Sequence, residues 1–335
     1  MKSQNIDVKS LLKAYNKTYN CRDCRKILNA KRLDFIGLSV KTKDVYNITA
    51  PFTSAGREYI AGRVESKKNE YESQVMFFKR EGKDDAWMLD EDAPIFRLQD
   101  PFVCIIGNEL IFGGVEIIFE QDAAKYFTVF FRGKDIYNLK LFVTGPIGMK
   151  DIRLVSMPNG SVGLFTRPQG VIGGKGRIGF MSINSIDILP QLKSEDYFAA
   201  QLLTGDFHDD EWLGVNAAYI LKNGSIGVLG HIARYSNNTE DDKKDNKKKL
   251  HKNYYPITFM FNPKTNTFTG MKIIVTRDYL PPGRSKAETL RNVLFAGGLV
   301  RCDDGTAIMY TGVGDAESYE IKMIDPFLEY EPKIQ

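Results

Sequence analysis

Five segments of this 335-residue chain have the pattern of a β-hairpin. Each joins two runs rich in β-branched and aromatic residues through a tight turn, and three of the turns carry Asn-Gly or Asp-Gly. The turn glycines are Gly56, Gly107, Gly160, Gly224 and Gly305. Successive glycines are far enough apart for a four-stranded propeller blade, which takes about forty residues or more. The spacing therefore favours one structural unit repeated five times.

We predict an all-β five-bladed β-propeller with a short N-terminal helical leader. The expected boundaries are 1–35 for the leader and 36–335 for a propeller that carries the catalytic site. Apolar residues recur at helical spacing near the start of the chain, at Val8, Leu11, Leu12 and Tyr15. Two packed β-sandwiches are the structural alternative.

Composition narrows the classes of function. No run of eighteen apolar residues is present, and residues 1–17 lack a signal-peptide pattern, so we expect a cytoplasmic protein and no membrane partner. The net charge is only +4, and much of the excess comes from residues 241–252, which we interpret as a solvated loop. We therefore expect no nucleic-acid partner. Oligomeric state stays open.

Cys21 and Cys24 form a lone C-x-x-C pair. A structural zinc site needs four ligands, and no second pair or nearby histidine completes the set. We expect neither a metal nor an organic cofactor.

Polar residues recur at fixed offsets from the turn glycines. In an antiparallel hairpin the start of the first strand and the end of the second lie side by side, opposite the turn. Positions seven to nine residues before the glycines hold Asn47, Asp100, Asp151, Asn216 and Gly297. Positions seven residues after them hold Arg63, Gly114, Arg167, His231 and Gly312. If these hairpins are the inner strands of five blades, the ten positions converge on one mouth, where a binding site is expected.

The predicted mouth is rich in cations. Guanidinium groups fit phosphate oxygens in bidentate geometry, and lysine adds a point charge. With flanking residues included, the candidate site residues are Asn47, Arg63, Glu65, Asp100, Glu116, Lys150, Asp151, Arg153, Arg167, Asn216, His231 and Asp315.

Asp100 is the candidate proton donor. The following Pro101 is predicted to hold Asp100 in extended backbone, and it removes a neighbouring N–H donor. A carboxylate with fewer hydrogen bonds to its charged form has a higher pKa, which suits a proton donor. The alternative is that the Asp-Pro pair only begins a strand. His231 alone would read as a core histidine, but it shares its offset with Arg63 and Arg167, which favours a site role.

These motifs resemble the mannoside phosphorylases of glycoside hydrolase family 130 and, more closely, the mannosyltransferase–phosphorylases of glycosyltransferase family 108. The resemblance runs from about residue 40 to 325. The matching elements are Asn47 in VYNITAPF, Arg63 and Glu65 in GRVE, Asp100 with Pro101, Lys150 and Asp151 in MKD, Arg167, His231 after Gly230, and Asp315 in YTGVGD. Gln99 and Phe102 stand where family 130 has Glu and Arg, and Leu229-Gly230 precede His231 in place of a tyrosine, which favours the second family.

The resemblance implies inverting phosphorolysis of β-1,2-linked mannosides, giving α-mannose 1-phosphate, and the reverse synthesis. Asp100 would be the general acid, and inorganic phosphate would be the co-substrate, with GDP-mannose as a further donor. The implied phosphate ligands are Arg63, Lys150, Arg153, Arg167 and His231. The implied sugar ligands are Asn47, Glu65, Glu116, Asp151, Asn216 and Asp315.

Two other functions stay open. An inverting hydrolase needs a second carboxylate to activate water, and Asn47 replaces the aspartate base of related propeller hydrolases, so Glu65 or Glu116 would have to serve. A propeller can also be a non-catalytic platform for protein binding.

Overall fold

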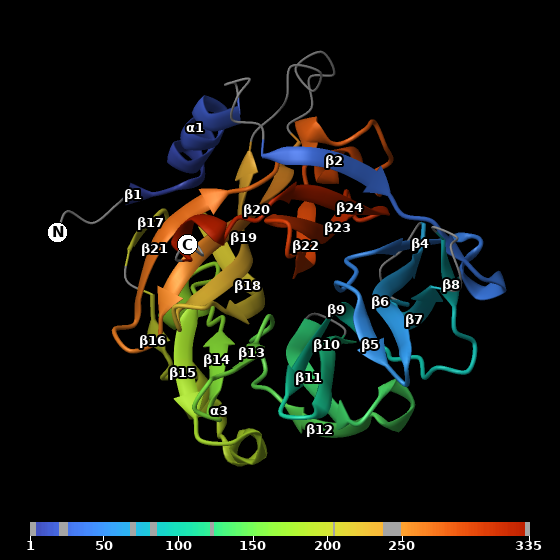
Figure 1. The fold of residues 1–335 in the computed structure, drawn as a ribbon, viewed down its shortest axis with the longest axis horizontal. Helices are drawn as coiled ribbons and strands as arrows, with labels where there is room; N and C mark the ends of the chain where they lie inside the picture. Colours follow the sequence, from blue (N-terminus) through green and yellow to red (C-terminus); the bar gives the residue numbers. More distant parts are fainter. Residues whose placement is uncertain are drawn as a thin grey trace.

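The computed structural model describes residues 5–19, 26–67, 72–80, 86–120, 124–203, 205–236 and 249–331. Five sheets, antiparallel except for one short parallel pair in the first, stand around a common axis like the blades of a propeller (Figure 1). The predicted fold is confirmed.

Each blade takes its strands from one stretch of chain, except the last. The first contains β3 (Phe35–Ile36), β4 (Lys43–Tyr46), β5 (Phe52–Ser54), β6 (Arg57–Ser66), β7 (Gln74–Arg80) and β8 (Trp87–Leu89). The second contains β9 (Gln99–Ile106), β10 (Glu109–Phe119), β11 (Ala124–Gly133) and β12 (Lys140–Thr144). The third contains β13 (Arg153–Ser156), β14 (Val162–Thr166), β15 (Gly179–Ile183) and β16 (Gln201–Leu202). The fourth contains β18 (Glu211–Ile220), β19 (Ile226–Ser236), β20 (His251–Asn262) and β21 (Thr267–Ile273). The fifth contains β22 (Leu294–Arg301), β23 (Thr306–Val313), β24 (Glu317–Ile324) and β2 (Ile27–Arg32).

The five predicted hairpins are the inner strand pairs of the five blades. They join β5 to β6, β9 to β10, β13 to β14, β18 to β19, and β22 to β23. All five turn glycines have a positive φ, between 62° at Gly107 and 83° at Gly160. Glycine reaches this region without the steric cost of a Cβ, which is why it marks the turns in the sequence.

The ring is closed by the N-terminal part of the chain. β2 pairs with β24 and becomes the outer strand of the fifth blade, so segment 1–35 contains a blade strand as well as the helix. Helix α1 (Val8–Tyr19) packs its Val8 and Tyr15 into the core between the third and fourth blades. The backbone N–H of Val8 donates to the buried carboxylate of Glu211 at 3.0 Å.

The remaining elements are short. They are β1 (Asn5–Ile6) paired with β17 (Asp206–Phe207), α2 (Gly170–Gly173), α3 (Ser194–Phe198), and the 3-10 turns η2 (Leu38–Val40), η3 (Ile136–Asn138), η4 (Ile186–Gln191), η5 (Arg277–Tyr279), η6 (Glu288–Leu290) and η7 (Leu328–Tyr330).

The core consists of five apolar clusters, and each lies between two neighbouring blades. Phe77 and Phe112 meet at 5.2 Å between the first and second blades, and Phe165 and Phe261 at 5.4 Å between the third and fourth. Aromatic pairs at such distances are stabilising beyond the area they bury. Packing between blades therefore holds the inner strands in a ring and fixes what they present to the axis.

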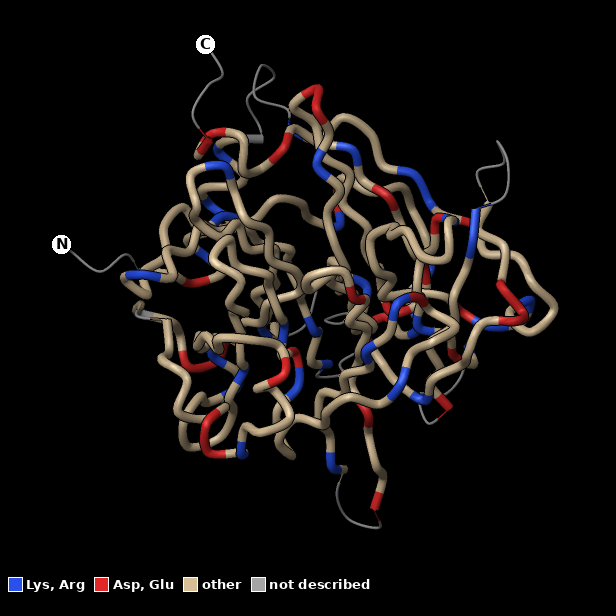
Figure 2. The backbone as a smooth tube through the Cα atoms, turned by 60° about the horizontal axis from the view of Figure 1, so that its bottom comes forward, with Lys and Arg blue, Asp and Glu red and all other residues tan. Residues whose placement is uncertain are grey.

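The interpretation of residues 241–252 as a solvated loop is wrong for the last two residues. His251 and Lys252 belong to strand β20, and Lys252 lies in the central mouth. The rest of the run, apart from Lys249 and Leu250, lies outside the described residues, as do Cys21 and Cys24. Basic and acidic positions are otherwise interspersed along the chain (Figure 2). Among the helices described, none is both long and apolar enough to span a bilayer.

Candidate active site

A cavity of about 240 Å³ opens where the inner strands begin. It contains seven of the predicted residues: Asn47, Arg63, Asp100, Lys150, Asp151, His231 and Asp315. Sequence reasoning missed its other lining residues, which are Gln99, Ile117, Lys252, Tyr254, Leu290, Val293 and Phe295. Side chains from four blades and from the connection that enters the third blade therefore meet here. Of the ten offset positions, five line the cavity: Asn47, Arg63, Asp100, Asp151 and His231.

Asp100 is held from two sides. Its Oδ1 accepts a hydrogen bond from Nδ2 of Asn47 at 2.7 Å and another from Nη1 of Arg63 at 3.1 Å. Within the described residues both of its hydrogen bonds go to Oδ1. Side chains of other segments thus replace the donor that Pro101 lacks, and among the described residues Oδ2 is left for a ligand.

The backbone at Asp100 differs from the prediction. Its φ is +49°, in the left-handed region, whereas Pro101 was predicted to impose extended backbone. Asn47 and Asp151 have φ values of +46° and +61° at the corresponding places of their blades. Asn and Asp tolerate this region better than other residues with a Cβ, and such strain is typical of functional sites. The repeated conformation turns three polar side chains toward one mouth.

Glycines at two rim positions have a steric reason. A Cβ on Gly312 would lie 2.0 Å from Oδ1 of Asn47, and one on Gly297 would lie 1.5 Å from the carbonyl oxygen of Ile48. The fifth blade thus contributes bare backbone so that the first blade's Asn47 can approach the axis.

Glu65 lies behind the cavity and does not line it. Its carboxylate accepts hydrogen bonds from Arg63 at 2.7 Å, from Ser73 and Tyr46 at 2.5 Å each, and from Lys286. Burial alone would raise the pKa of Glu65, but the ion pair with Arg63 and the other three donors hold that pKa below its ordinary value. Glu65 is therefore a fixed anion that positions Arg63, and so Asp100.

Asp151, which precedes the first strand of the third blade, is paired with two arginines. It is buried and lies 3.2 Å from Nη1 of Arg167 and 3.6 Å from Nη2 of Arg153. Burial would raise its pKa, but the two guanidinium groups keep that pKa lowered. Arg167 also donates to the carbonyl of Leu213 at 2.6 Å, and Arg153 to the carbonyl of Asn216 at 3.1 Å. Neither arginine lines the cavity; both lie behind Asp151, which does.

His231 lines the cavity as a neutral side chain. It is 1% exposed, and burial, together with Arg167 and Lys150 against the opposing effect of Asp151, lowers its pKa to about 3. Its Nδ1 lies 2.9 Å from Oδ1 of Asn216, a contact that fixes the ring. Asn216 itself does not line the cavity, so its structural position is that of a support for His231.

Lys150 and Lys252 are the two cavity cations without an ion-pair partner among the described residues. Their ammonium groups lie 5.9 Å and 6.0 Å from the ring centroids of Tyr126 and Tyr254. Burial lowers the pKa of Lys150. Two ammonium groups that form no ion pair within the described residues, beside a neutral histidine, form a place for an anion.

Two further hollows adjoin this site. Glu116 lines one of about 330 Å³, next to the cavity but separate from it. Arg153 and Asn216 line another hollow, of about 340 Å³, whose walls are the first strands of the inner hairpins.

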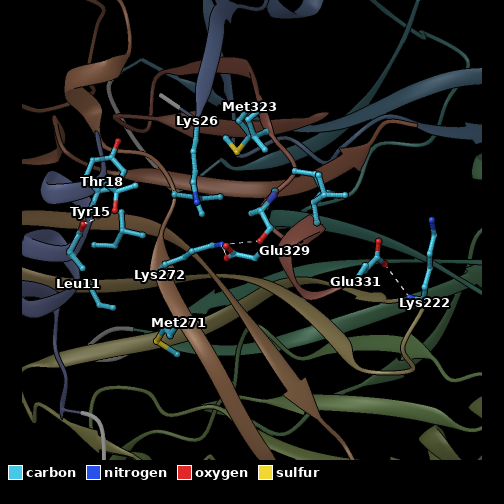
Figure 3. A pocket seen from close by; sticks show the side chains of 17 residues that line it. Leu11, Tyr15, Thr18, Lys26, Lys222, Met271, Lys272, Met323, Glu329 and Glu331 are labelled. Atoms are coloured by element: carbon cyan, nitrogen blue, oxygen red, sulfur yellow. Dashed lines mark hydrogen bonds and ion pairs between the residues drawn. The ribbon is translucent and has the colours of Figure 1, made fainter. Parts of the chain in front are cut away.

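The largest hollow described, about 620 Å³, lies far from these residues, between α1 and the outer strands β21 and β24 (Figure 3). Its walls are mainly apolar, and Lys272 there is paired with Glu329. None of the predicted site residues reaches it. In the described part of the chain no three His, Cys, Asp or Glu side chains are grouped to hold a metal ion.

Comparison with known proteins shows the family of this chain. The family model described as "Protein of unknown function (DUF1861)" matches residues 20–329. None of the curated proteins is significantly similar in sequence. MPT-4, a mannose phosphorylase from Leishmania mexicana solved with a phosphate ion, is 32% identical over 98% of both chains, with a TM-score of 0.84. MPT-1, a GDP-Man-dependent mannosyltransferase from the same organism, is 31% identical over 98% of this chain and 97% of that one, with a TM-score of 0.83.

A β-1,2-mannobiose phosphorylase from Listeria innocua shares the fold, with a TM-score of 0.59 over 90% of this chain and 96% of that one at 15% identity. The chain therefore belongs to the DUF1861 family, and with the two Leishmania enzymes to glycosyltransferase family 108, whose motifs its sequence resembles.

Proposed function

We propose that this enzyme is an inverting phosphorylase of β-1,2-linked mannosides, with α-mannose 1-phosphate as its product. The observation that carries the proposal is the placement of Asp100 in one cavity with Lys150 and Lys252, two cations without an ion-pair partner among the described residues. An acid and an anion site that share a cavity meet the two needs of phosphorolysis. The similarity to a mannose phosphorylase solved with phosphate supports the choice of sugar and of anion.

The reaction is a single displacement. A phosphate oxygen, held by Lys150, Lys252 and His231, attacks the anomeric carbon of the terminal mannosyl unit. The new C–O bond to phosphate forms as the glycosidic C–O bond breaks, and Asp100 gives a proton to the leaving oxygen, directly or through a sugar hydroxyl. Arg63 and Asn47 hold Asp100, while Arg153 and Arg167 act from beneath the cavity through Asp151.

Hydrolysis is less well supported than phosphorolysis. It requires a carboxylate free to activate water on the far face of the sugar. Glu65 is engaged by four donors, and Glu116 lies in a separate hollow, so neither stands ready for that role. Phosphate brings its own negative charge and needs no such base.

Mannosyl transfer from GDP-mannose is the second candidate function. It is favoured by the 31% identity to a GDP-Man-dependent mannosyltransferase, close to the 32% identity to the phosphorylase. Both reactions use the same carboxyl and the same anion site. In phosphorolysis Asp100 gives a proton to the leaving oxygen, whereas in transfer it takes the proton of the acceptor hydroxyl as GDP leaves from the anion site.

The experiment compares donors and linkages. The purified chain is incubated with phosphate and β-1,2-, β-1,3- or β-1,4-mannobiose, and separately with GDP-mannose and mannose. Sugar phosphate released from the β-1,2-linked disaccharide alone supports the proposal. Equal release from all three linkages contradicts the linkage assignment, and transfer from GDP-mannose without phosphorolysis favours the second function.

A further inference from the structure

The hollow of about 330 Å³ beside the cavity lies on the side of Asp100. Gln99, which directly precedes Asp100 in β9, lines both the hollow and the cavity, and so does Ile117 of β10. The hollow is formed by the second blade and the loop before it, together with Ser73 of the first blade. A molecule held in the cavity can therefore extend into the hollow past Gln99 and Ile117.

The stereochemistry of an inverting displacement indicates which part of the substrate lies there. Nucleophile and leaving group stand on opposite faces of the reacting sugar. Lys150 of the anion site lies in the connection before the third blade and Lys252 in the fourth blade, whereas the acid that protonates the leaving oxygen comes from the second. The leaving sugar must contact Asp100 and point away from the lysines. The hollow meets the cavity at Gln99, next to Asp100, and neither Lys150 nor Lys252 lines it.

The walls of the hollow suit a neutral sugar. Glu116 is half-buried there and offers carboxylate oxygens that accept hydrogen bonds from hydroxyl groups, while the exposed Arg97 offers donors. Phe119 presents a ring that is 49% exposed, an apolar surface for the C–H face of a pyranose. Among the described residues Arg97 is the one cation that lines this hollow, whereas Arg63, Lys150 and Lys252 all line the cavity.

We propose that this hollow binds the leaving portion of the mannoside chain in phosphorolysis and the acceptor oligomannoside in synthesis, with Glu116 and Arg97 as residues that determine acceptor affinity. The assignment rests on the proposed function, and it places Glu116 outside the subsite of the mannosyl unit that is transferred. Acceptor binding and donor binding then depend on different blades.

Steady-state kinetics in the synthetic direction test the assignment. Glu116→Ala and Arg97→Ala are each expected to raise the KM for the acceptor β-1,2-mannobiose about ten-fold or more, the scale of one lost hydrogen bond to a charged group. The KM for mannose 1-phosphate should stay within about two-fold, since that subsite is untouched. Glu109→Gln is the matched control, because Glu109 lies at the other end of β10, paired with Arg132. An unchanged acceptor KM, or equal rises in both constants, would overturn the assignment.

A binding measurement separates this inference from the proposed function. Calorimetric titration of β-1,2-mannobiose into the phosphate-free protein should show weaker binding for Glu116→Ala than for Glu109→Gln. If the wild type binds the disaccharide in this Glu116-dependent way without turning it over, the proposed reaction fails while the subsite stands. If turnover occurs and Glu116→Ala binds like the control, the subsite fails while the reaction stands.

Discussion

Nη1 of Arg63 lies 3.1 Å from Oδ1 of Asp100, across the boundary between the first and second blades. Arg63 is in turn bound to Glu65, and Glu65 to Lys286 in the connection between the fourth and fifth blades. The proposed acid is thus oriented by a chain of charges drawn from three parts of the ring. Its position depends on the assembled propeller and not on its own strand alone.

Replacing the acid should stop the reaction without unfolding the protein. Asp100→Asn keeps an acceptor for Asn47 and Arg63 but cannot donate a proton in the same way, so kcat should fall by about 10² to 10⁴. The change is measured by release of mannose 1-phosphate, with Tm as the check on folding. Turnover within a few-fold of wild type in a folded variant would remove Asp100 from the mechanism.

Lys286→Met should be strongly destabilising. It leaves the buried carboxylate of Glu65 short of one charged partner, and breaking a buried pair typically costs about 3–5 kcal/mol. The exposed pair of Lys125 with Glu120 is the control, where Lys125→Met should cost about 1 kcal/mol or less. Chemical denaturation of both variants measures the difference. A loss at Lys286 no greater than at Lys125 would show that the Glu65 network does not hold the site.

The stability of the protein should depend on His231 at mildly acid pH. Its pKa is lowered to about 3 in the folded protein and is 6.5 in a model peptide. Above pH 6.5 the ring is neutral in both states and contributes no pH dependence. Between pH 6.5 and 3 the unfolded chain binds the proton and the folded protein does not, so the free energy of unfolding falls as pH falls, by up to about 1.4 kcal/mol per unit.

His231→Gln removes that contribution. Denaturation at pH 7 and pH 5 should show a smaller loss of stability in the variant than in the wild type over this interval. Equal losses in the two proteins would mean that His231 is not held neutral by the fold.

Lys252→Met should affect phosphate selectively. Because Lys252 has no ion-pair partner among the described residues, its loss should raise the KM for phosphate by about ten-fold while the KM for the mannoside changes little. Lys175→Met is the control, since Lys175 is exposed and paired with Asp210. Arg167→Ala should instead lower stability, because Asp151 would lose its nearest guanidinium. Equal rises in both KM values for Lys252→Met would argue against its phosphate role.

The sequence predicted the ring because local turn chemistry is repeated in it. The five glycines mark hairpins that any context would favour, and the offsets from them located Asn47, Asp100, Asp151 and His231 at the mouth. Arg63 was located in the same way, seven residues after Gly56, whereas Glu65, taken from the GRVE motif, lies behind the cavity.

What the sequence did not reveal comes from outside the hairpins. Lys252 follows a lysine-rich run, and the run alone does not distinguish it from the other lysines. Its role becomes visible only in the structure, where β20 brings its side chain to the cavity. Lys286 lies in a connection without any repeat, and its partner Glu65 is 221 residues away. A shift of register between Gly113 and Val115 accompanies the displacement of Glu116 into the neighbouring hollow, and a β-bulge of this kind changes which side chains after it face the axis.

The most direct measurement follows β-1,2-mannobiose by proton and phosphorus NMR, with and without inorganic phosphate. If Asp100 faces a phosphate held by Lys150, Lys252 and His231, α-mannose 1-phosphate and mannose accumulate in equal amounts, and nothing is released when phosphate is absent. The β-anomer of the sugar phosphate, or mannose released equally under both conditions, would contradict the account.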